Sequence, residues 1–405
     1  MAAELQSWKE LASYLGVSVR TVQLWERARA LPVRRLPGPN GRIVALPAEL
    51  DAWRTAQPPP PPRPPYLIYT AIALLSLLAG AVATWLYLRP SPLHHFTVDN
   101  GIVTAFNKQG RPTWTFHSGT NSPTGPGTFF SKIVQTDLDA DGADELLVTR
   151  ELPNTNHLLY CFNARGDVLW TRSLGRTVQT AVETLEPPFF ARGFDVLRGF
   201  PDGVPRIVTV AHHHLWYPSQ LLVLDIHGNI LGEYWHSGHL TAFTLFDLDL
   251  DGHPELIVAG INQASKSAEL AILDPLHLTG ASTEPNPAFQ FLAMPTGVER
   301  ARAVLSPSRL SRLTAAYNVP VALFPKRDTL LLDVHEGTGV GTPGNALTYE
   351  FNRQLQVLSI SPSDQFNISQ AAFVRSGKLS HAVTPSELVR ELPLRWIKHW
   401  PNLAK

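Results

Sequence analysis

The chain has 405 residues, of which 44% are hydrophobic and 17% are charged, and its formal net charge is zero. This composition is typical of a globular chain, excludes an intrinsically disordered one and predicts two or three domains. Its one cysteine, Cys161, excludes an internal disulfide and is expected to be a buried apolar residue. Charge is uneven, because residues 1–65 carry nine Lys and Arg against five Asp and Glu, whereas the rest carries 25 against 29. A small basic module therefore precedes a large, slightly acidic one.

The N-terminal region predicts three short helices and a hairpin. Ser7 and Glu10 form a capping box at the start of the first helix, and Gly16 ends it. Ser18 caps a second helix, expected to run to about residue 27. A short hairpin with Pro-Asn-Gly near its tip follows, and a third helix begins near Pro47.

This region, SWKELASYLGVSVRTVQLWERARALPVRRLPGPNGRIVALPAELDAWR, resembles the MerR or excisionase-type winged helix-turn-helix over about 48 of the 405 residues. In that family the second helix enters the major groove and the wing contacts the backbone or minor groove. The resemblance implies a DNA-binding domain over residues 1–56, whose symmetry a homodimer would supply. A solvated charged surface is the alternative. The implied DNA contacts are Ser18, Arg20, Thr21, Gln23 and Arg27 from the second helix, and Arg34, Arg35 and Arg42 from the wing.

Two segments connect this module to the rest of the chain. Residues 57–65, QPPPPPRPP, predict an extended Pro-rich linker. Residues 66–88, YLIYTAIALLSLLAGAVATWLYL, carry no charge and predict a transmembrane helix in the lipid bilayer, with a buried core helix as the alternative. Because most cations precede this run, the positive-inside rule places the N-terminus in the cytoplasm and the remainder in the periplasm or outside the cell. The predicted location is therefore single-pass in the inner (cytoplasmic) membrane.

Beyond residue 89, short strand-like runs alternate with turn residues. One repeated unit comprises VTAFNKQGRPTWTFHSG, LLYCFNARGDVLWTRSLG and LLVLDIHGNILGEYWHSG, and it places an Asn or Asp at positions 107, 163 and 225, with weaker copies at 274 and 352. Such a period favours a propeller over residues 89–385, of about five blades with four to seven open, followed by a tail over residues 386–405. Ring closure predicts one blade with strands from both ends of the domain.

A second unit lies between copies of the first. It comprises FFSKIVQTDLDADGADELLVTR, FTLFDLDLDGHPELIVAG and a degenerate GFDVLRGFPDGVPRIVTVA. These units resemble FG-GAP or VCBS repeats of integrin-like propellers. The predicted fold is therefore multidomain: a small all-α winged helix-turn-helix, a single transmembrane helix and an all-β propeller.

The two clear copies of this second unit contain Asp-x-Asp-x-Asp-Gly-x-x-Glu, which places oxygen ligands at alternate positions of a tight loop. Clustered carboxylates repel one another unless a hard cation lies among them, which favours Ca²⁺. An Asp-rich turn that caps its own amides is the alternative. The predicted ligands are Asp137, Asp139, Asp141, the Ala143 carbonyl and Glu145 in one loop, and Asp247, Asp249, Asp251, the His253 carbonyl and Glu255 in the other. The degenerate copy over residues 195–202 is expected to bind nothing.

No nucleophile elbow, phosphate loop or His-Glu-x-x-His motif occurs, so no enzyme activity is predicted. Residues 212–214 are three histidines, but alternate strand positions face opposite sides, so exposed imidazoles at a strand end are expected rather than a metal site. The predicted function is a membrane-anchored one-component transcription regulator with a cytoplasmic DNA-binding head and an exported propeller that senses an unknown ligand or protein. The alternatives are a membrane-tethered binding or adhesion propeller whose N-terminal module contacts protein, and a propeller quinoprotein enzyme.

Overall fold

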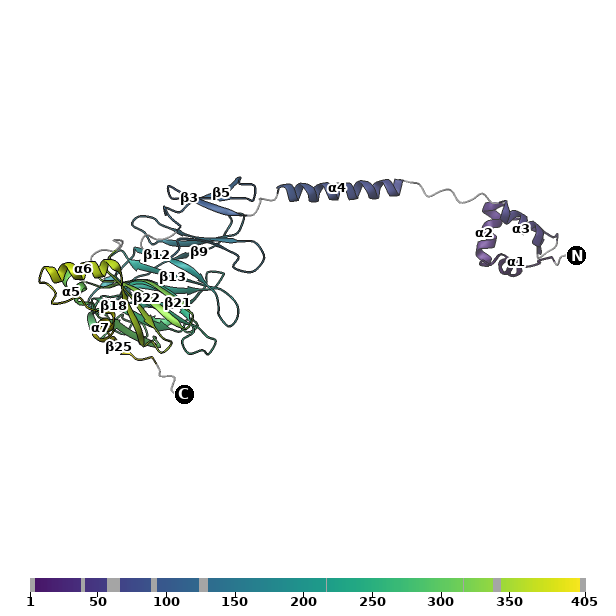
Figure 1. The fold of residues 1–405 in the computed structure, drawn as a ribbon. Helices are drawn as coiled ribbons and strands as arrows, with labels where there is room; N and C mark the ends of the chain where they lie inside the picture. Colours follow the sequence, from purple (N-terminus) through teal and green to yellow (C-terminus); the bar gives the residue numbers. More distant parts are fainter. Residues whose placement is uncertain are drawn as a thin grey trace. The chain divides into compact units, whose positions relative to one another are not determined.

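The structure is a computed structural model that describes residues 4–37, 41–56, 66–88, 93–123, 130–215, 217–315, 317–337 and 344–400. The chain divides into two compact units, residues 1–89 and 90–405 (Figure 1). The predicted linker at 57–65 and the Pro-Asn of the predicted hairpin tip at 39–40 lie outside the described residues.

The first two helices begin where the sequence predicts, and the first also ends there, whereas the second runs to Arg29 rather than to about residue 27. The Ser7 hydroxyl accepts a hydrogen bond from the Glu10 amide at the start of α1, and Gly16 ends that helix with a left-handed φ of 68°. The Ser18 hydroxyl caps α2 by accepting from the amide of Thr21. These capping interactions confirm the predicted starts of α1 and α2 and the predicted end of α1. The helices of this unit are α1 (Trp8–Leu15), α2 (Val19–Arg29), α3 (Pro47–Thr55) and α4 (Tyr66–Leu88).

The predicted separate all-α winged helix-turn-helix head is wrong. Between α2 and α3, strand β1 (Arg34–Arg35) pairs antiparallel with β2 (Ile43–Val44). The β-branched side chains of β2 favour a strand and are buried, and Ile43 packs in the same hydrophobic cluster as Leu11 and Leu50 of the helices. The strands therefore help to build the core, and the region is mixed α and β.

The predicted transmembrane helix and the inner-membrane location derived from it are also wrong. A helix forms over the predicted residues as α4. However, none of the helices in the described part of the chain is sufficiently long and apolar to cross a membrane.

The second unit is built mainly from five sheets of three to five strands, whose strands pair antiparallel except at β19 (Figure 1). The first contains β3 (His95–Asp99), β4 (Ile102–Phe106) and β5 (Pro112–His117), and the second contains β6 (Ile133–Thr136), β7 (Glu145–Arg150), β8 (Leu158–Phe162) and β9 (Val168–Ser173). The third contains β12 (Phe189–Leu197), β13 (Arg206–His213), β14 (Ser219–Leu224) and β15 (Ile230–His236), joined in parallel by β19 (Thr279–Ala281). The fourth contains β16 (Gly238–Phe246), β17 (Glu255–Asn262), β18 (Ser267–Leu273), β20 (Ala301–Leu305) and β25 (Leu394–Lys398), and the fifth contains β21 (Val319–Lys326), β22 (Thr329–His335), β23 (Ala346–Phe351) and β24 (Val357–Pro362). A two-stranded pair, β10 (Val178–Gln179) and β11 (Thr184–Leu185), and the short helices η1 (Pro287–Phe289), α5 (Arg309–Thr314), α6 (Asp364–Arg375) and α7 (Pro385–Glu391) complete this unit.

Buried side chains join each sheet to the next, and alternate residues of one strand face opposite neighbours. Leu146 and Val148 of β7 pack toward the first sheet, whereas Leu147 lies in the cluster shared with the third. Cys161 is buried in that same cluster, as predicted, and burial raises the pKa of its thiol to about 12. This succession of sheets is propeller-like.

The predicted blade with strands from both ends of the domain is wrong. The last strand, β25, pairs with β20 in the fourth sheet rather than with the first. Helix α7 and Trp400 pack in the cluster that joins the fourth and fifth sheets, so the C-terminal segment has its own apolar partner. Within the described residues, none of the buried clusters joins the first sheet to the fifth.

The repeated Asn or Asp forms the same turn in successive sheets. Its side-chain oxygen accepts hydrogen bonds from backbone amides two and four residues later at Asn107, Asn163 and Asp225. The repeated Trp then packs on the glycine of the next such turn. A Cβ on Gly166 would lie 2.6 Å from Trp114, so only glycine fits beneath that ring. The repeat noticed in the sequence is therefore an inter-sheet packing unit.

Candidate metal centre

Two acidic loops connect the first two strands of their sheets, residues 137–144 between β6 and β7 and residues 247–254 between β16 and β17. Gly142 and Gly252 have φ of 86° and 83°, as a tight turn requires. The fourth residues of the loops, Ala140 and Leu250, are also left-handed, with φ of 63° and 62°. The two loops therefore adopt one backbone conformation.

Their hydrogen bonds also correspond. In the first loop, Asp137 Oδ2 accepts from the Gly142 amide at 3.0 Å, Asp139 Oδ1 from the Asp141 amide at 3.1 Å, and Glu145 Oε2 from the Leu138 amide at 2.9 Å. The same bonds in the second loop measure 3.1, 3.3 and 2.9 Å. Each of these carboxylates thus bonds a loop amide through one of its two oxygens.

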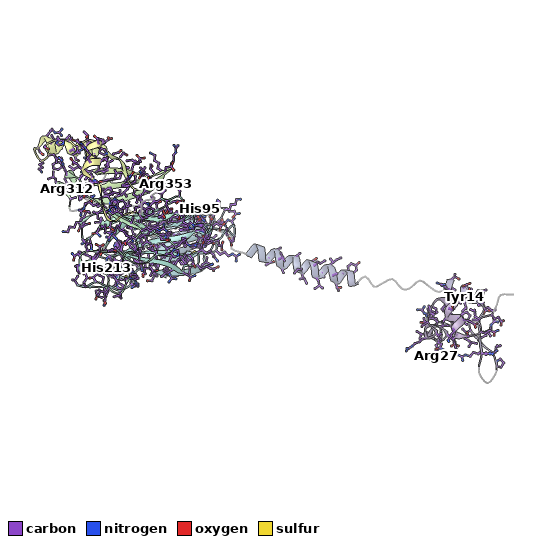
Figure 2. The ribbon with its side chains drawn as sticks, turned by 90° about the horizontal axis from the view of Figure 1, so that it is seen from below. Tyr14, Arg27, His95, His213, Arg312 and Arg353 are labelled. Atoms are coloured by element: carbon purple, nitrogen blue, oxygen red, sulfur yellow. The ribbon has the colours of Figure 1, made fainter. Side chains whose placement is uncertain are left out.

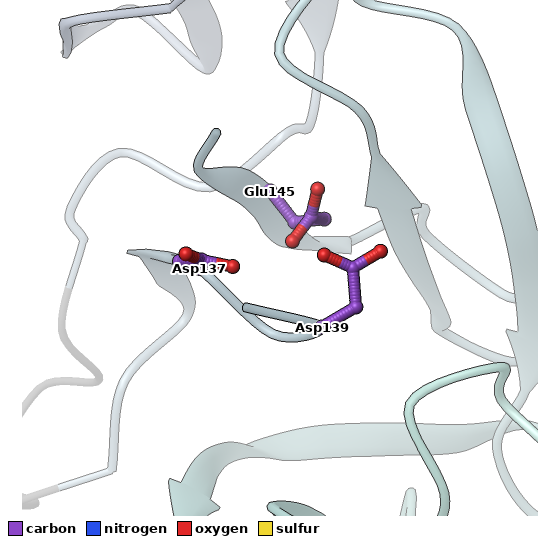
Figure 3. A group of neighbouring side chains, drawn as sticks. All are labelled: Asp137, Asp139 and Glu145. Atoms are coloured by element: carbon purple, nitrogen blue, oxygen red, sulfur yellow. The ribbon is translucent and has the colours of Figure 1, made fainter. Parts of the chain in front are cut away.

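The loops bring part of each predicted ligand set together. Carboxylate oxygens of Asp137, Asp139 and Glu145 lie within 4.8 Å of one another, and Figure 3 shows these side chains converging. In the second loop the corresponding group is Asp247, Asp249 and Asp251. Asp141 lies outside the first group and Glu255 outside the second.

The predicted carbonyl ligands come from residues of different exposure. Ala143 is half-buried and His253 is exposed. The amide of each residue donates, at 2.7 Å, to Oδ1 of the third loop aspartate, Asp141 or Asp251. Because Asp251 makes this bond and still lies in the second group, the bond alone does not explain why Asp141 lies outside the first.

Two observations fit a cation in these loops. The Oδ1 atoms of Asp137 and Asp247 are shielded from solvent and have no hydrogen-bond partner among the described residues. Burial raises the pKa of Glu145, and the neighbouring carboxylates raise it further, whereas the Leu138 amide opposes this. A hard cation bound by oxygen ligands would satisfy both the orphaned oxygens and the repulsion.

Three arginines that sequence reasoning missed contact the loops. Arg300 forms an ion pair with the Glu255 carboxylate and lies 3.3 Å from Asp274. Arg198 Nη2 donates to the Asp137 carbonyl at 2.9 Å, and Arg353 Nη1 donates to the equivalent carbonyl of Asp247. No sequence signal pointed to these residues, because each is far from its loop along the chain.

The predicted DNA contacts lie in the first unit, one group along α2 and the other on the hairpin. Ser18, Arg20, Gln23 and Arg27 are exposed on α2, with Arg27 at the surface in Figure 2, and Thr21 is half-buried. On the hairpin, Arg34 is paired with Glu49 and Arg35 with Glu26, whereas Arg42 is exposed. The guanidiniums of the hairpin are thus partly neutralised within the chain.

The histidines at 212–214 are less exposed than expected. His213 is buried, with Nε2 2.8 Å from the Glu186 carbonyl, and only His214 is exposed. His212 packs against His239 with ring centroids 4.7 Å apart, and burial lowers its pKa to about 4. In the degenerate third copy, the Asp202 carboxylate accepts from the Val204 amide and pairs with Arg206.

Comparison with known proteins finds only solved structures of low sequence identity and low TM-score. No family model matches the chain, and no curated protein matches it. Among solved structures, the Dos1 propeller is 8% identical with a TM-score of 0.35, covering 68% of this chain and 64% of its own. The Pseudomonas aeruginosa PilY1 C-terminal domain is 12% identical with a TM-score of 0.31, covering 64% and 78%.

A GH43 β-1,3-galactosidase with galactodeoxynojirimycin is 11% identical with a TM-score of 0.31, covering 68% of this chain and 80% of its own. The chain thus spans less than two thirds of the Dos1 propeller. The similar structures thus include a galactosidase as well as a propeller.

Proposed function

We propose that residues 90–405 form a calcium-dependent binding protein whose two acidic loops each hold one Ca²⁺. The orphaned, shielded Oδ1 atoms of Asp137 and Asp247 carry this proposal. An Asp-rich turn that only caps its own amides would leave such an atom in water or bonded, because a buried acceptor without a partner costs about 1–3 kcal/mol. All-oxygen donor sets favour Ca²⁺ or Mg²⁺, and irregular loop geometry favours the larger ion.

A binding role is supported by how the loop carboxylates are used. Asp137, Asp139 and Glu145 each bond a loop amide, so a cation there would fix the connection between two strands. The second loop also borders a cavity of about 240 Å³ lined in part by Asp251, Glu255 and Arg300. Stabilised loops beside a cavity are suited to presenting a binding surface.

Equilibrium dialysis of the full chain against ⁴⁵Ca²⁺, with and without excess Mg²⁺, tests the proposal. We expect two saturable sites that Mg²⁺ displaces poorly. Asp137→Asn with Asp139→Asn should remove one site, and Asp247→Asn with Asp249→Asn the other. Absence of saturable binding in the unmutated chain would show that the loops are self-capped turns.

We further propose that α2 binds DNA, on one specific observation. Arg20, Gln23 and Arg27 recur at helical spacing and are exposed, whereas Val22 on the opposite face is buried in the core. Arg and Gln on one helix face match the edges of guanine and adenine. A transcriptional role for the chain would follow from such binding.

A gel shift of the full chain on mixed-sequence duplex DNA, at 50 and 200 mM salt, tests this second proposal. Arg20→Ala with Arg27→Ala should weaken binding and reduce its salt dependence. Arg54→Ala, an exposed arginine on α3, is the matched control. If the unmutated chain fails to shift DNA, or if the control weakens binding equally, α2 is not a DNA-binding helix.

A further inference from the structure

We propose that a cavity beside the second acidic loop binds a small oxyanion, that is, a ligand carrying a carboxylate, phosphate or sulfate group. The cavity has a volume of about 370 Å³ and is lined by residues of the third, fourth and fifth sheets. This volume lies within the usual range for small-molecule sites. The residues that matter for recognition are Arg198, Asp247, Arg327 and Arg353.

The net positive charge of the residues that line the cavity favours an anionic ligand. Three of the lining residues are arginines, one is the acidic Asp247, and the others are uncharged. The cavity therefore has an excess of two positive charges. A guanidinium presents its donors in a planar fork that matches the two oxygens of a carboxylate, phosphate or sulfate.

Arg353 is held in place before any ligand arrives. Its Nη1 donates to the Asp247 carbonyl, its Nη2 lies 3.2 Å from the Asp328 carboxylate, and its guanidinium lies 4.7 Å from the centre of the Phe246 ring. The side chain, labelled in Figure 2, is 18% exposed. Binding through such a side chain loses little rotamer entropy, which favours affinity.

Arg198 approaches from the loop after β12 and retains free donors. Its Nη2 bonds Thr136 Oγ1 at 2.7 Å and the Asp137 carbonyl at 2.9 Å. Within the described residues its Nε and Nη1 make no hydrogen bond. Arg198 therefore links the first acidic loop to the cavity beside the second and has donors left for a ligand.

Arg327 is the third arginine of the cavity, and its guanidinium, unpaired among the described residues, is free to bind an external anion. It lies in the turn between β21 and β22 with φ of 54°, a conformation that disfavours side chains with a Cβ. The side chain is exposed and makes no hydrogen bond or ion pair in the described part of the chain. An arginine in a left-handed turn without an internal partner is consistent with recognition of an external one.

Calcium and the anion should affect one another. This step rests on the proposed calcium site, because Asp247 and Gly252 belong to the second acidic loop and also line the cavity. A divalent cation among Asp247, Asp249 and Asp251 would offset the acidic charge beside the arginines. Each ligand should then tighten the binding of the other by the same factor.

Isothermal titration of the full chain with sulfate and, separately, succinate tests the cavity. The buffer contains 100 mM chloride and is either stripped of divalent ions with a chelating resin or supplied with 1 mM Ca²⁺. We expect saturable binding of at least one probe in both buffers, and tighter binding with calcium. Arg327→Ala should weaken it at least about tenfold through loss of charge-assisted hydrogen bonds. The matched control is Arg165→Ala, another exposed turn arginine, which should bind normally.

The outcomes separate this inference from the calcium proposal. Binding that Arg327→Ala removes but calcium leaves unchanged supports the cavity and overturns its coupling to the second loop. A calcium-binding chain that shows no saturable binding of either probe overturns the cavity alone. Equal weakening by Arg327→Ala and Arg165→Ala also overturns it, because the binding is then only unspecific attraction to surface charge.

Discussion

The two acidic loops share a backbone conformation and a set of hydrogen bonds but differ in the charges around them. In the second loop, the Glu255 carboxylate is paired with Arg300, and the loop position before it is Pro254. In the first, the equivalent Glu145 has no cationic partner among the described residues, and the position before it is Asp144. The first loop therefore concentrates more uncompensated negative charge on the same frame.

This comparison shows that the repeat determines the geometry of each loop, whereas the surrounding residues determine its electrostatics. The aspartate spacing fixes the loop geometry, since both copies form the same amide bonds. The residues that the fold brings against each loop then set the electrostatics. A fixed cation such as Arg300 already offsets part of the repulsion that calcium would relieve. We therefore expect the first loop to bind calcium more tightly and to depend on it more.

The largest expected effect tests that ranking directly. Calcium at about 100 times Kd should stabilise the folded chain by about 2.7 kcal/mol per site. Asp137→Asn with Asp139→Asn should remove this stabilisation from the first loop at calcium concentrations that barely saturate the second. Asp247→Asn with Asp249→Asn should show its effect only at higher calcium. Urea unfolding of the full chain over a calcium series measures both, and equal calcium dependence of the two double variants would contradict the ranking.

A smaller effect is expected from removing the cation that distinguishes the second loop. Arg300→Met should destabilise the calcium-free chain by about 2 kcal/mol, less than a fully buried pair would lose, because Arg300 is 35% exposed. The same variant should bind calcium more tightly at this loop. Added calcium should therefore reduce the difference in unfolding free energy between the variant and the unmutated chain.

The matched control for this variant is Arg300→Met combined with Glu255→Gln, which removes both charges. It should recover part of the calcium-free stability without gaining calcium affinity. If Arg300→Met leaves calcium affinity at the second loop unchanged, Arg300 does not offset the negative charge of the loop carboxylates.

Local sequence signals predicted local structure well. The caps at Ser7, Gly16 and Ser18 act between residues at most four apart, so the helix boundaries of the first unit were readable from the sequence. The aspartate spacing likewise predicted the loops and most of their carboxylate groups. In the first unit, the error concerned the fold class. The sequence predicted the hairpin, but its two-residue strands were not counted as part of the core, where Ile43 lies.

Long-range contacts were not predictable in the same way. Arg300, Arg198 and Arg353 contact loop residues that are 45, 61 and 106 positions away. No periodicity specifies such contacts, because they depend on which strands pair and on which sheets pack together. For the same reason the pairing of β25 with β20 was missed, and ring closure by the chain ends was predicted instead.

A third prediction compares the arginines that bond the first carbonyl of each loop. Arg353→Ala should destabilise the chain by about 1.5 kcal/mol, since it removes a shielded charged hydrogen bond and the contact with the Phe246 ring. Arg198→Ala should cost less than about 1 kcal/mol, because Arg198 is exposed to solvent. Urea midpoints of the two variants measure the difference. A larger loss for Arg198→Ala would show that solvent exposure does not govern these contacts.

The smallest expected effect tests the shared backbone. Ala140 and Leu250 both have a left-handed φ, which costs a residue with a Cβ about 1–2 kcal/mol, and both side chains are exposed. Replacing either with glycine removes that cost but adds about 0.4–1 kcal/mol of unfolded-chain entropy. Ala140→Gly and Leu250→Gly should therefore each stabilise the calcium-free chain by about 0.5 kcal/mol, measured as a rise in the urea midpoint. Because the loops differ in charge but not in conformation, the two gains should be equal. A gain in only one variant would mean that the two loops do not share the same strain, and that differences in calcium binding could not then be assigned to charge alone.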